Sequence, residues 1–152
     1  MEPTARRAAR VVLVDARDRV LLFLGGDPAE PGQPYWFTPG GGLDPGETPA
    51  EGAARELLEE TGLRISPAGL GEPVHSEIAC FSYAGVQYRQ EQEFFLVRVP
   101  AWEVDMSGID EAEVVDLVGH RWWTVPELLR TEELYFPRDL VELLKRLGIP
   151  AC

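Results

Sequence analysis

The sequence predicts a single α/β or α+β domain in which a mixed β-sheet lies between helices. Three observations support this class. Apolar runs bounded by turn residues predict strands, segments with helical periodicity predict helices, and the two kinds of element alternate irregularly with hairpins among the strands. No shift in composition divides the chain, so we expect one domain over residues 1–152.

The amino-terminal part predicts a basic, alanine-rich lead followed by two strands. Apolar runs at residues 10–15 and 20–24 are joined by four polar residues, which is a hairpin signal, so the two strands should be antiparallel neighbours. Residues 25–34 are rich in glycine and proline and predict a loop. The aromatic run at residues 35–38 predicts a short strand that ends at Pro39 and leads into a glycine-rich loop.

The best-defined helix of the sequence begins at Pro49. Thr48 is a favourable N-cap, proline is tolerated at the first helical position, and Glu51 completes a capping box with Thr48. Alanine and leucine then recur at helical spacing, and Gly62 can take the left-handed conformation just past the last turn. We therefore expect a helix from Pro49 to about Thr61.

The second half of the chain predicts several strands and two more helices. The polar entry at residues 90–93 can face a site, although an exposed strand start is the simpler interpretation. A short helix should open at residue 125, and the apolar periodicity of residues 137–147 predicts an amphipathic helix that packs across the sheet. The predicted strands are residues 63–65, 74–84, 87–99 and 120–124.

Three carboxylates crowd one side of the helix that begins at Pro49. Glu56, Glu59 and Glu60 stand at positions i, i+3 and i+4, which places their Cβ atoms roughly 5–6 Å apart. Acidic helix faces are common at protein surfaces, and like charges at this spacing destabilise a bare helix. Here a glycine loop, beginning at Gly40, precedes the helix and allows backbone groups to approach a phosphate or a metal. We interpret the cluster as a site for a hard divalent cation, of which Mg²⁺ is the usual choice beside phosphates.

Arg55 can hold this arrangement in register. It lies eight residues after Glu47 and four before Glu59, so its guanidinium can tie the loop carboxylate to the helix. We assign Arg55 and Glu47 an orienting role.

The spacing of these residues resembles the Nudix box. Every fixed position of that pattern is filled, by Gly41, Glu47, Arg55, Glu56, Leu57, Glu59, Glu60, Gly62 and Leu63. The resemblance implies the Nudix α/β/α sandwich and hydrolysis, dependent on Mg²⁺ or Mn²⁺, of a diphosphate linkage in a nucleoside diphosphate joined to another moiety. It also implies that homodimers are frequent among relatives, although no interface can be identified in the sequence.

The chemistry suited to such a cluster is attack by water on a phosphorus atom, with a carboxylate taking the proton. We expect Glu56 and Glu60 to be metal ligands and Glu59 to be a third ligand or the base. The Gly40 carbonyl is a further ligand implied by the resemblance. The resemblance also implies a carboxylate from a loop outside the box, for which Glu111 is the first candidate and Glu113 the second. Which glutamate is the base stays open.

Composition limits the partners. The chain carries 14 basic and 26 acidic residues, a net charge of −12, which argues against broad capture of nucleic acid or an anionic membrane and favours a small substrate. No apolar run approaches the roughly 18 residues of a membrane span. Cys80 and Cys152 have no CxxC partner, so a zinc site or disulfide framework is not supported, and a reducing cytoplasm fits. Cys80 lies in an apolar run and should be a buried structural thiol.

Two other functions stay open at this point. One is a non-catalytic module that senses a nucleotide and regulates a partner, although an intact box argues against it. The other keeps the chemistry but acts on the 5′ triphosphate end of RNA, for which Arg6, Arg7, Arg10 and Arg89 would have to form a local basic patch. Aromatic side chains that could stack on a base, each also explicable as packing, are Tyr35, Trp36, Tyr88, Trp102 and Trp122.

Overall fold

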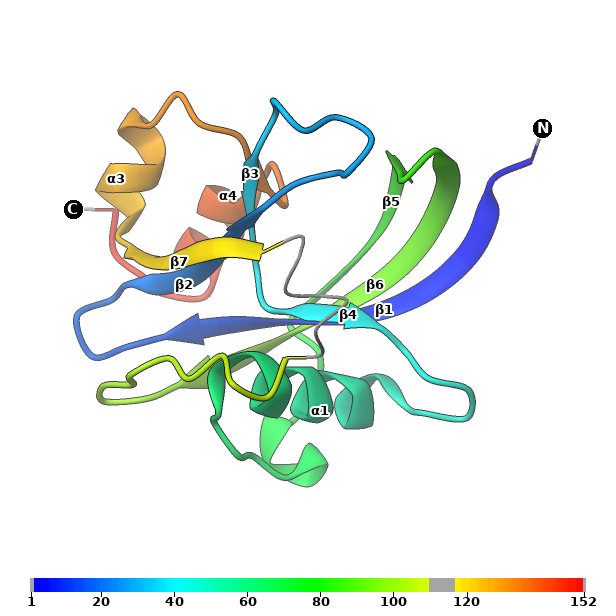
Figure 1. Ribbon diagram of the computed structural model, residues 1–152. Helices are drawn as coiled ribbons and strands as arrows, with labels where there is room; N and C mark the ends of the chain where they lie inside the picture. Colours follow the sequence, from blue (N-terminus) through cyan, green and yellow to red (C-terminus); the bar gives the residue numbers. More distant parts are fainter. Residues whose placement is uncertain (1, 110–116, 152) are drawn as a thin grey trace.

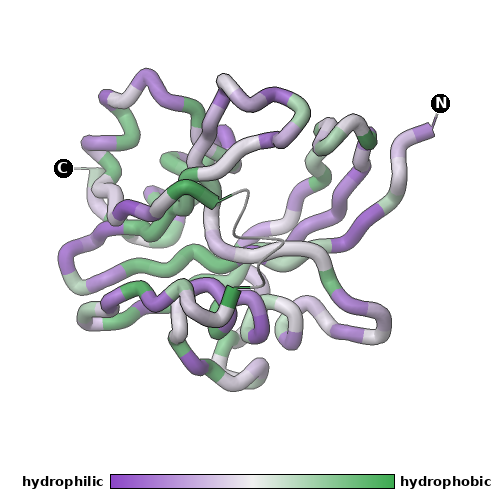
Figure 2. The backbone as a smooth tube through the Cα atoms, viewed as in Figure 1, coloured by the Kyte–Doolittle hydropathy of each residue, from purple (hydrophilic) through white to green (hydrophobic). Residues whose placement is uncertain are grey.

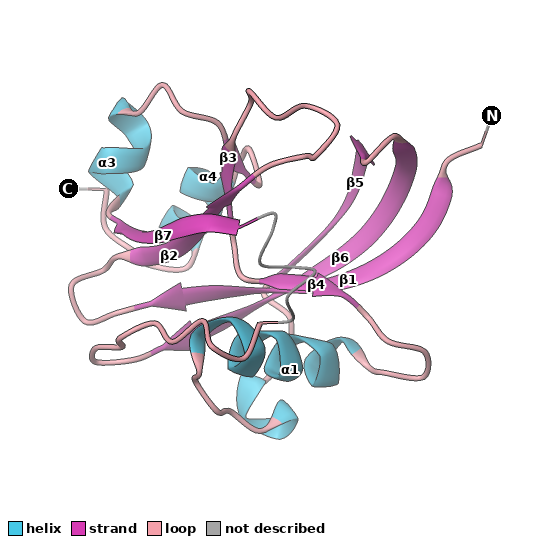
Figure 3. Ribbon diagram, viewed as in Figure 1, coloured by secondary structure: helices cyan, strands magenta, loops and turns pink. Residues whose placement is uncertain are grey.

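The computed structural model describes residues 2–109 and 117–151 and shows a mixed, curled sheet with helices on both sides (Figures 1 and 3). Within these described residues the sheet has eight strands, in the order β5-β6-β1-β2-β3-β8, with β4 paired to β1 and β7 paired to β2. The strands are β1 (Thr4–Val14), β2 (Val20–Gly25), β3 (Tyr35–Phe37), β4 (Gly40–Gly42), β5 (His75–Tyr83), β6 (Val86–Arg98), β7 (Leu117–Trp123) and β8 (Tyr135–Phe136). The helices are α1 (Pro49–Thr61), the 3₁₀ turn η1 (Pro67–Leu70), α3 (Val125–Arg130) and α4 (Leu140–Arg146). This confirms the predicted α/β class.

Two hydrophobic cores lie on opposite faces of the sheet, and the alternation of side chains along β1 contributes to both. Val11 and Leu13 are fully buried in the core on the α1 side. Val12 and Val14 are fully buried in the core that also contains the apolar residues of α3 and α4. A strand covered on both faces reads as a continuous apolar run, which is why this part of β1 was recognisable from the sequence.

The first strand is longer than predicted. We expected it to begin at residue 10, but β1 begins at Thr4 and pairs in parallel with β6 from Tyr88 to Arg98, while its end pairs antiparallel with β2 as expected. Apart from Thr4, the extra residues are arginine and alanine, which are not among the residues enriched in strands, so the long-range partner rather than local preference makes them extended.

Three other local predictions differ from the structure. Residues 63–65 form no strand, because the chain turns after α1 into η1, where Ser66 accepts a hydrogen bond from the backbone N–H of Gly69 at 3.1 Å. Part of the expected glycine loop is strand β4. Cys80 is exposed, so the prediction of a buried thiol is wrong. Alternate residues of β5 face solvent, and Ile78, two positions earlier, is also 53% exposed.

The character of the sheet changes along its strands. Figure 2 shows hydrophobic residues concentrated around β2 and the adjoining part of β1, and mainly hydrophilic ones where β5, β6 and β1 extend beyond the helices. The same change occurs on one face of β6, where Gln90 and Gln92 are followed by Phe94. No helix in the described part of the chain is long and apolar enough to cross a membrane.

Asp15 closes the turn between β1 and β2. Its carboxylate is buried and accepts hydrogen bonds from the backbone N–H groups of Arg17 and Arg19, both at 3.0 Å, and from Arg19 Nε at 2.8 Å. Burial alone would raise the pKa of Asp15, but these hydrogen bonds outweigh it and lower the pKa below its ordinary value of 3.8. A lowered pKa in the folded state stabilises the fold above the ordinary value, and that stabilisation is lost as the pH falls through the folded-state pKa.

We predict that Asp15→Asn lowers the free energy of unfolding by about 1.5–3 kcal/mol at pH 7, the range for hydrogen bonds to a charged group. The difference from the unsubstituted protein should shrink as the pH falls below about 3.8. Urea unfolding at several pH values measures it. Asp18→Asn, in the same turn at a positive φ that asparagine tolerates, is the control and should change stability by less than about 0.5 kcal/mol. A pH-independent loss for Asp15→Asn would contradict this account.

Candidate active site

Helix α1 begins and ends at the predicted residues. Thr48 Oγ1 accepts a hydrogen bond from the Glu51 N–H at 3.2 Å, and Glu51 Oε1 accepts one from the Thr48 N–H at 2.9 Å, so the capping box is complete. Gly62 ends the helix in the left-handed conformation with φ 77°. These caps fix the position of the carboxylates along the helix.

Two of those carboxylates lie against the backbone of β4. Glu60 Oε1 accepts a hydrogen bond from the Gly40 N–H at 2.8 Å, and a Cβ at Gly41 would lie 2.8 Å from Glu56 Oε1. Both glutamates are only 5% exposed. Gly40 has φ 142°, and a Cβ there would collide with the carbonyl oxygen of Ala9. The missing side chain of Gly41 therefore lets Glu56 approach β4, and that of Gly40 lets β4 approach β1.

Arg55 ties the segment before the helix to these carboxylates. Its Nε and Nη2 donate to the two oxygens of Glu47 at 2.8 and 2.9 Å, and Nη2 also donates to the Gly42 carbonyl at 3.1 Å. On the other side Nη1 donates to Glu56 Oε1 at 3.0 Å and lies 3.4 Å from Glu59 Oε2. The hydrogen bonds with Arg55 lower the pKa of Glu47, and those with Glu47 raise the pKa of Arg55. The Arg55–Glu47 pairing inferred from their spacing is thus present.

The remaining predicted site residues are placed differently. Glu59 lies on the same side of α1, but its side chain is 35% exposed and is not part of the wall of the adjoining cavity. Glu111 and Glu113, the candidates for a carboxylate outside the box, lie outside the described residues.

Two arginines of β1 add positive charge beside the buried glutamates. Arg6 and Arg10 both line the cavity, and Arg10 Nη1 donates to the Thr38 carbonyl at 3.1 Å. Burial lowers the pKa of Arg10, and the nearby Glu60 carboxylate opposes that effect. The sequence suggested these arginines only as part of a patch for RNA. Their shared position in the cavity was missed because the predicted strand began at residue 10, so Arg6 was not placed on the same strand face as Arg10.

A cavity of about 1100 Å³ extends from the glutamates of α1 to the start of α4. Its floor is the face of β1, β6 and β5, including Gln90 and Gln92, so the simpler interpretation of residues 90–93 as an exposed strand start is wrong for these two. Aromatic side chains of β3 and β8 form part of its wall, and Tyr35 meets Phe136 edge-to-face with centroids 5.3 Å apart. Trp36, one of the aromatic candidates for stacking, is instead buried in the core.

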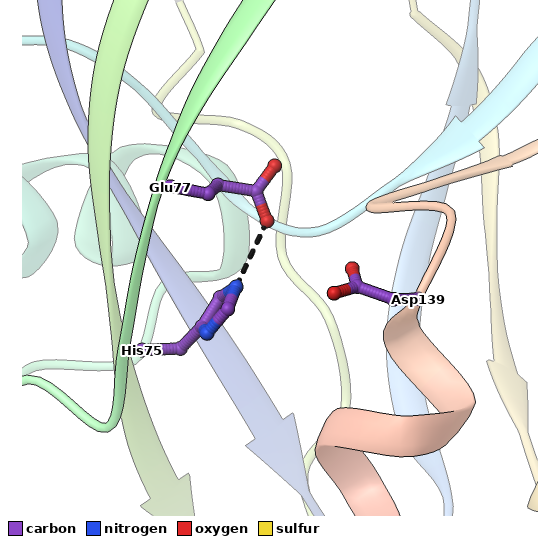
Figure 4. A group of neighbouring side chains, drawn as sticks. All are labelled: His75, Glu77 and Asp139. Carbon is purple, nitrogen blue, oxygen red and sulfur yellow. Dashed lines mark hydrogen bonds and ion pairs between the residues drawn. The ribbon is translucent and has the colours of Figure 1, made fainter.

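At the far end of the cavity, His75, Glu77 and Asp139 point toward one another from β5 and the start of α4 (Figure 4). They are the three metal-ligating side chains, among the described residues, whose ligand atoms all lie within 4.8 Å of one another. In this arrangement, however, Arg146 Nη2 lies 3.2 Å from His75 Nδ1, and His75 Nε2 lies 3.0 Å from Glu77 Oε1. Arginine can only donate, so His75 Nδ1 accepts a hydrogen bond from Arg146. Nε2 therefore carries the ring proton and donates a hydrogen bond to Glu77. Neither ring nitrogen has a free lone pair for a metal ion.

The fold and this geometry define an α/β protein with buried helix carboxylates, a glycine backbone and arginines around one end of a cavity. A NUDIX domain model matches residues 4–144, and the chain therefore belongs to the Nudix family. It is 41% identical over 106 residues to a putative 8-oxo-dGTP diphosphatase of Bacillus subtilis, an alignment covering 70% of this chain and 62% of that protein. It is 32% identical over 120 residues to an RNA pyrophosphohydrolase of Erythrobacter litoralis, covering 69% and 68% of the two proteins. Such alignments span as little as 59% of a curated relative's length.

Solved structures show the same fold. A MutT protein from Methanosarcina mazei superposes with a TM-score of 0.72 at 20% identity, covering 97% of this chain and 96% of that one. The E. coli dihydroneopterin triphosphate pyrophosphohydrolase superposes with a TM-score of 0.67 at 18% identity, covering 95% and 97%. At this identity the likeness concerns the fold, and it confirms the expected Nudix architecture.

The residues at the α1 end fit a hard divalent cation. Glu56 and Glu60 supply carboxylate oxygens at the cavity wall, and oxygen is the ligand that Mg²⁺ and Mn²⁺ prefer. The side chain missing from Gly41 leaves the space that the Glu56 carboxylate occupies, and a Cβ there would fill it. Arg55 and Arg10 balance part of their charge.

We predict that Gly40→Ala destabilises the fold, because alanine is strained at φ 142° and its Cβ meets the backbone of β1. The free energy of unfolding should fall by about 1–3 kcal/mol for the strain alone. Gly119→Ala is the control, since a Cβ there meets nothing within 4 Å, and its effect should stay within about 0.5 kcal/mol. Denaturant unfolding of both variants measures the difference, and equal stabilities would show that the close approach of β4 to β1 is not required.

Proposed function

We propose that this protein is a Nudix pyrophosphohydrolase that hydrolyses a diphosphate linkage in a nucleoside diphosphate joined to another moiety. The observation that carries the proposal is the pair of buried carboxylates, Glu56 and Glu60, held against a glycine backbone at one end of a cavity that also exposes arginines. Burying two carboxylates costs free energy, and a site for cations and phosphates is a reason to retain them. The names of the curated relatives, which are pyrophosphohydrolases and a diphosphatase, support the same chemistry.

We assign the binding of Mg²⁺, or Mn²⁺ in its place, to Glu56, Glu60, Glu59 and the Gly40 carbonyl. When bound, such an ion would offset the negative charge of the phosphoryl oxygens. Arg55 and Glu47 hold the glutamates in position from behind, through the hydrogen bonds described above. The proton of the attacking water passes to a carboxylate, and we assign Glu59, the partly exposed glutamate of the cluster, as either a third ligand or this base.

The net charge of the protein gives a reason for arginines to lie beside the glutamates. The chain carries a charge of −12, so a polyphosphate is repelled unless positive groups gather where it binds. Arg6 and Arg10, on the same face of β1, supply such groups beside the glutamates. We propose that these two arginines bind the phosphate oxygens of the substrate.

The decisive assay is turnover of a panel of NDP-sugars, dinucleoside polyphosphates, NTPs and oxidised NTPs with Mg²⁺ or Mn²⁺. Release of phosphate, diphosphate or a nucleoside monophosphate supports the proposal. No turnover of any member, together with tight binding of a nucleotide, would favour the non-catalytic sensor.

We predict that Glu60→Gln lowers kcat/KM for the best substrate by about 100-fold or more, the loss expected when several kcal/mol of metal-derived stabilisation is removed. The Gly40 N–H can still donate to the amide oxygen, so the circular dichroism spectrum and unfolding midpoint should change little. Glu51→Gln on the same helix is the control, because glutamine also completes a capping box, and its activity should be unchanged. Full activity of Glu60→Gln at saturating Mg²⁺ would remove this residue from the proposed site.

We predict that Arg6→Met raises KM for the phosphorylated substrate by roughly tenfold, the effect of losing one charge-assisted hydrogen bond to phosphate. Arg7→Met is the matched control, since the next residue of β1 lies on the opposite face and outside the cavity. Steady-state kinetics of both variants at constant ionic strength makes the comparison, and equal KM values for the two would contradict the assignment of Arg6.

A second candidate substrate is the 5′ triphosphate end of RNA, which is favoured by the relatives named RNA pyrophosphohydrolases. The basic patch this substrate would need is divided in the structure. Arg6 and Arg10 line the cavity, whereas Arg89 is exposed outside it, 3.7 Å from Glu91. Cleavage of a 5′-triphosphorylated oligonucleotide faster than of the matching NTP would favour RNA. A rate that does not rise with oligonucleotide length would favour the small substrate.

A further inference from the structure

We propose that the floor of the cavity, at Gln90, reads the base of the nucleotide and selects one that presents N–H donors, with guanine as the preferred natural base. This proposal rests on the function proposed above and adds the identity of the group selected away from the phosphates. The observation behind it is a buried amide oxygen without a partner on the floor of the cavity.

Gln90 is 1% exposed and lines the cavity, yet its Oε1 has no hydrogen-bond partner among the described residues. The other two unpartnered buried side-chain atoms in the described part of the chain are the indole nitrogens of Trp36 and Trp123, neither of which lines the cavity. An unpaired buried acceptor costs stability, so its presence at the floor of a cavity points to a ligand that supplies the missing donor.

The direction of the hydrogen bonds around Gln90 fixes this atom as an acceptor. Gln90 Nε2 donates to Gln92 Oε1 at 2.7 Å, and Gln92 Nε2 donates to Glu77 Oε2 at 3.1 Å. A carboxylate only accepts, so Gln92 must turn its nitrogen toward Glu77 and its oxygen toward Gln90. Gln90 must in turn give its nitrogen to Gln92. Because Glu77 can only accept, the atom left unpaired at the end of this series of hydrogen bonds is the oxygen of Gln90 and not its nitrogen.

The neighbours of Gln90 and Gln92 follow from the register of the sheet. Gln90 lies between Arg6 of β1 and Ala79 of β5, and Gln92 lies between Ala8 and Glu77. Ala79, which lines the cavity, has a short side chain that leaves room above the floor. Beyond Gln92, the carboxylates of Glu77 and Asp139 approach from opposite sides, and Asp139 makes no capping hydrogen bond although it stands at the N-cap of α4 (Figure 4). This end of the cavity thus offers acceptors, while Arg6 and Arg10 offer donors at the phosphate end.

Guanine is the natural base whose Watson–Crick edge carries two adjacent N–H donors, a ring N–H and an exocyclic amine. The amine projects beyond the ring, and it is the donor that we assign to the amide oxygen of Gln90. The aromatic wall formed by Tyr35 and Phe136 supplies apolar surface for a planar base. Hypoxanthine differs from guanine only in lacking the exocyclic amine, which makes the two bases a matched pair for a test.

The experiment compares the dissociation constants of GMP and IMP by isothermal titration calorimetry, and kcat/KM for GTP and ITP with Mg²⁺. The protein should prefer the guanine nucleotide by at least about tenfold, the value of one well-placed hydrogen bond. Gln90→Met removes the acceptor at similar volume and should reduce the preference to within about twofold. Gln87→Met, on an exposed part of the same strand and outside the cavity, is the control and should keep it.

Glu77→Gln tests the directional argument. The amide at residue 77 can donate, so the side-chain amides of Gln92 and Gln90 can both flip. Gln90 would then present its nitrogen, instead of its oxygen, to the ligand. The preference for GMP over IMP should fall or reverse while the packing is preserved. A merely structural role of Glu77 would weaken binding of both nucleotides by the same factor.

The outcomes separate this inference from the proposed function. Discrimination between GMP and IMP without turnover of any diphosphate would overturn the hydrolase and leave the base site standing. Turnover with equal affinities for the two bases, failure of both monophosphates to bind, or retention of the preference in Gln90→Met would overturn the base site.

Discussion

The structure depends on the burial of two carboxylates against the glycine backbone of β4. Glu56 and Glu60 are both 5% exposed, and each is compensated at short range, by Arg55 at 3.0 Å and by the Gly40 N–H at 2.8 Å. Removing water from a carboxylate costs several kcal/mol unless such partners are in place. The capping box of α1, the conformation of Gly40 and the register of β4 on β1 all serve to bring these partners together.

Strand β1 connects this requirement with the rest of the molecule. Its residues alternate between the core under α1 and the opposite face, and on that face Arg6 and Arg10 line the cavity before Val12 joins the hydrophobic core. Strand β6 makes the same change between Gln92 and Phe94. The two strands pair in parallel and Arg10 lies opposite Phe94, so the change from polar to apolar in β1 comes two residues after the change in β6. One sheet face can therefore be a cavity floor at one end and a packed core at the other.

The parts of the site that the sequence predicted are those fixed by local interactions. The capping box, the end of α1 at Gly62 and the reach of Arg55 to Glu47 involve residues at most eight positions apart, where spacing along the chain determines distance in space. Sequence reasoning also placed the β1–β2 hairpin and the apolar part of β6, because apolar runs are informative when both faces of a strand are buried.

The parts that sequence reasoning missed depend on pairing between distant segments. Three glycines have no preference for a strand, and β4 exists because β1 pairs with it. Cys80 was expected inside and lies outside because the register of β5 on β6, not local hydrophobicity, decides which residues face the core. The same register turns Gln90 and Gln92 inward, although their sequence neighbourhood is polar and acidic. A single change of register by one residue would exchange these glutamines with Glu91 and Glu93, and the directional chain that ends at Gln90 would not form.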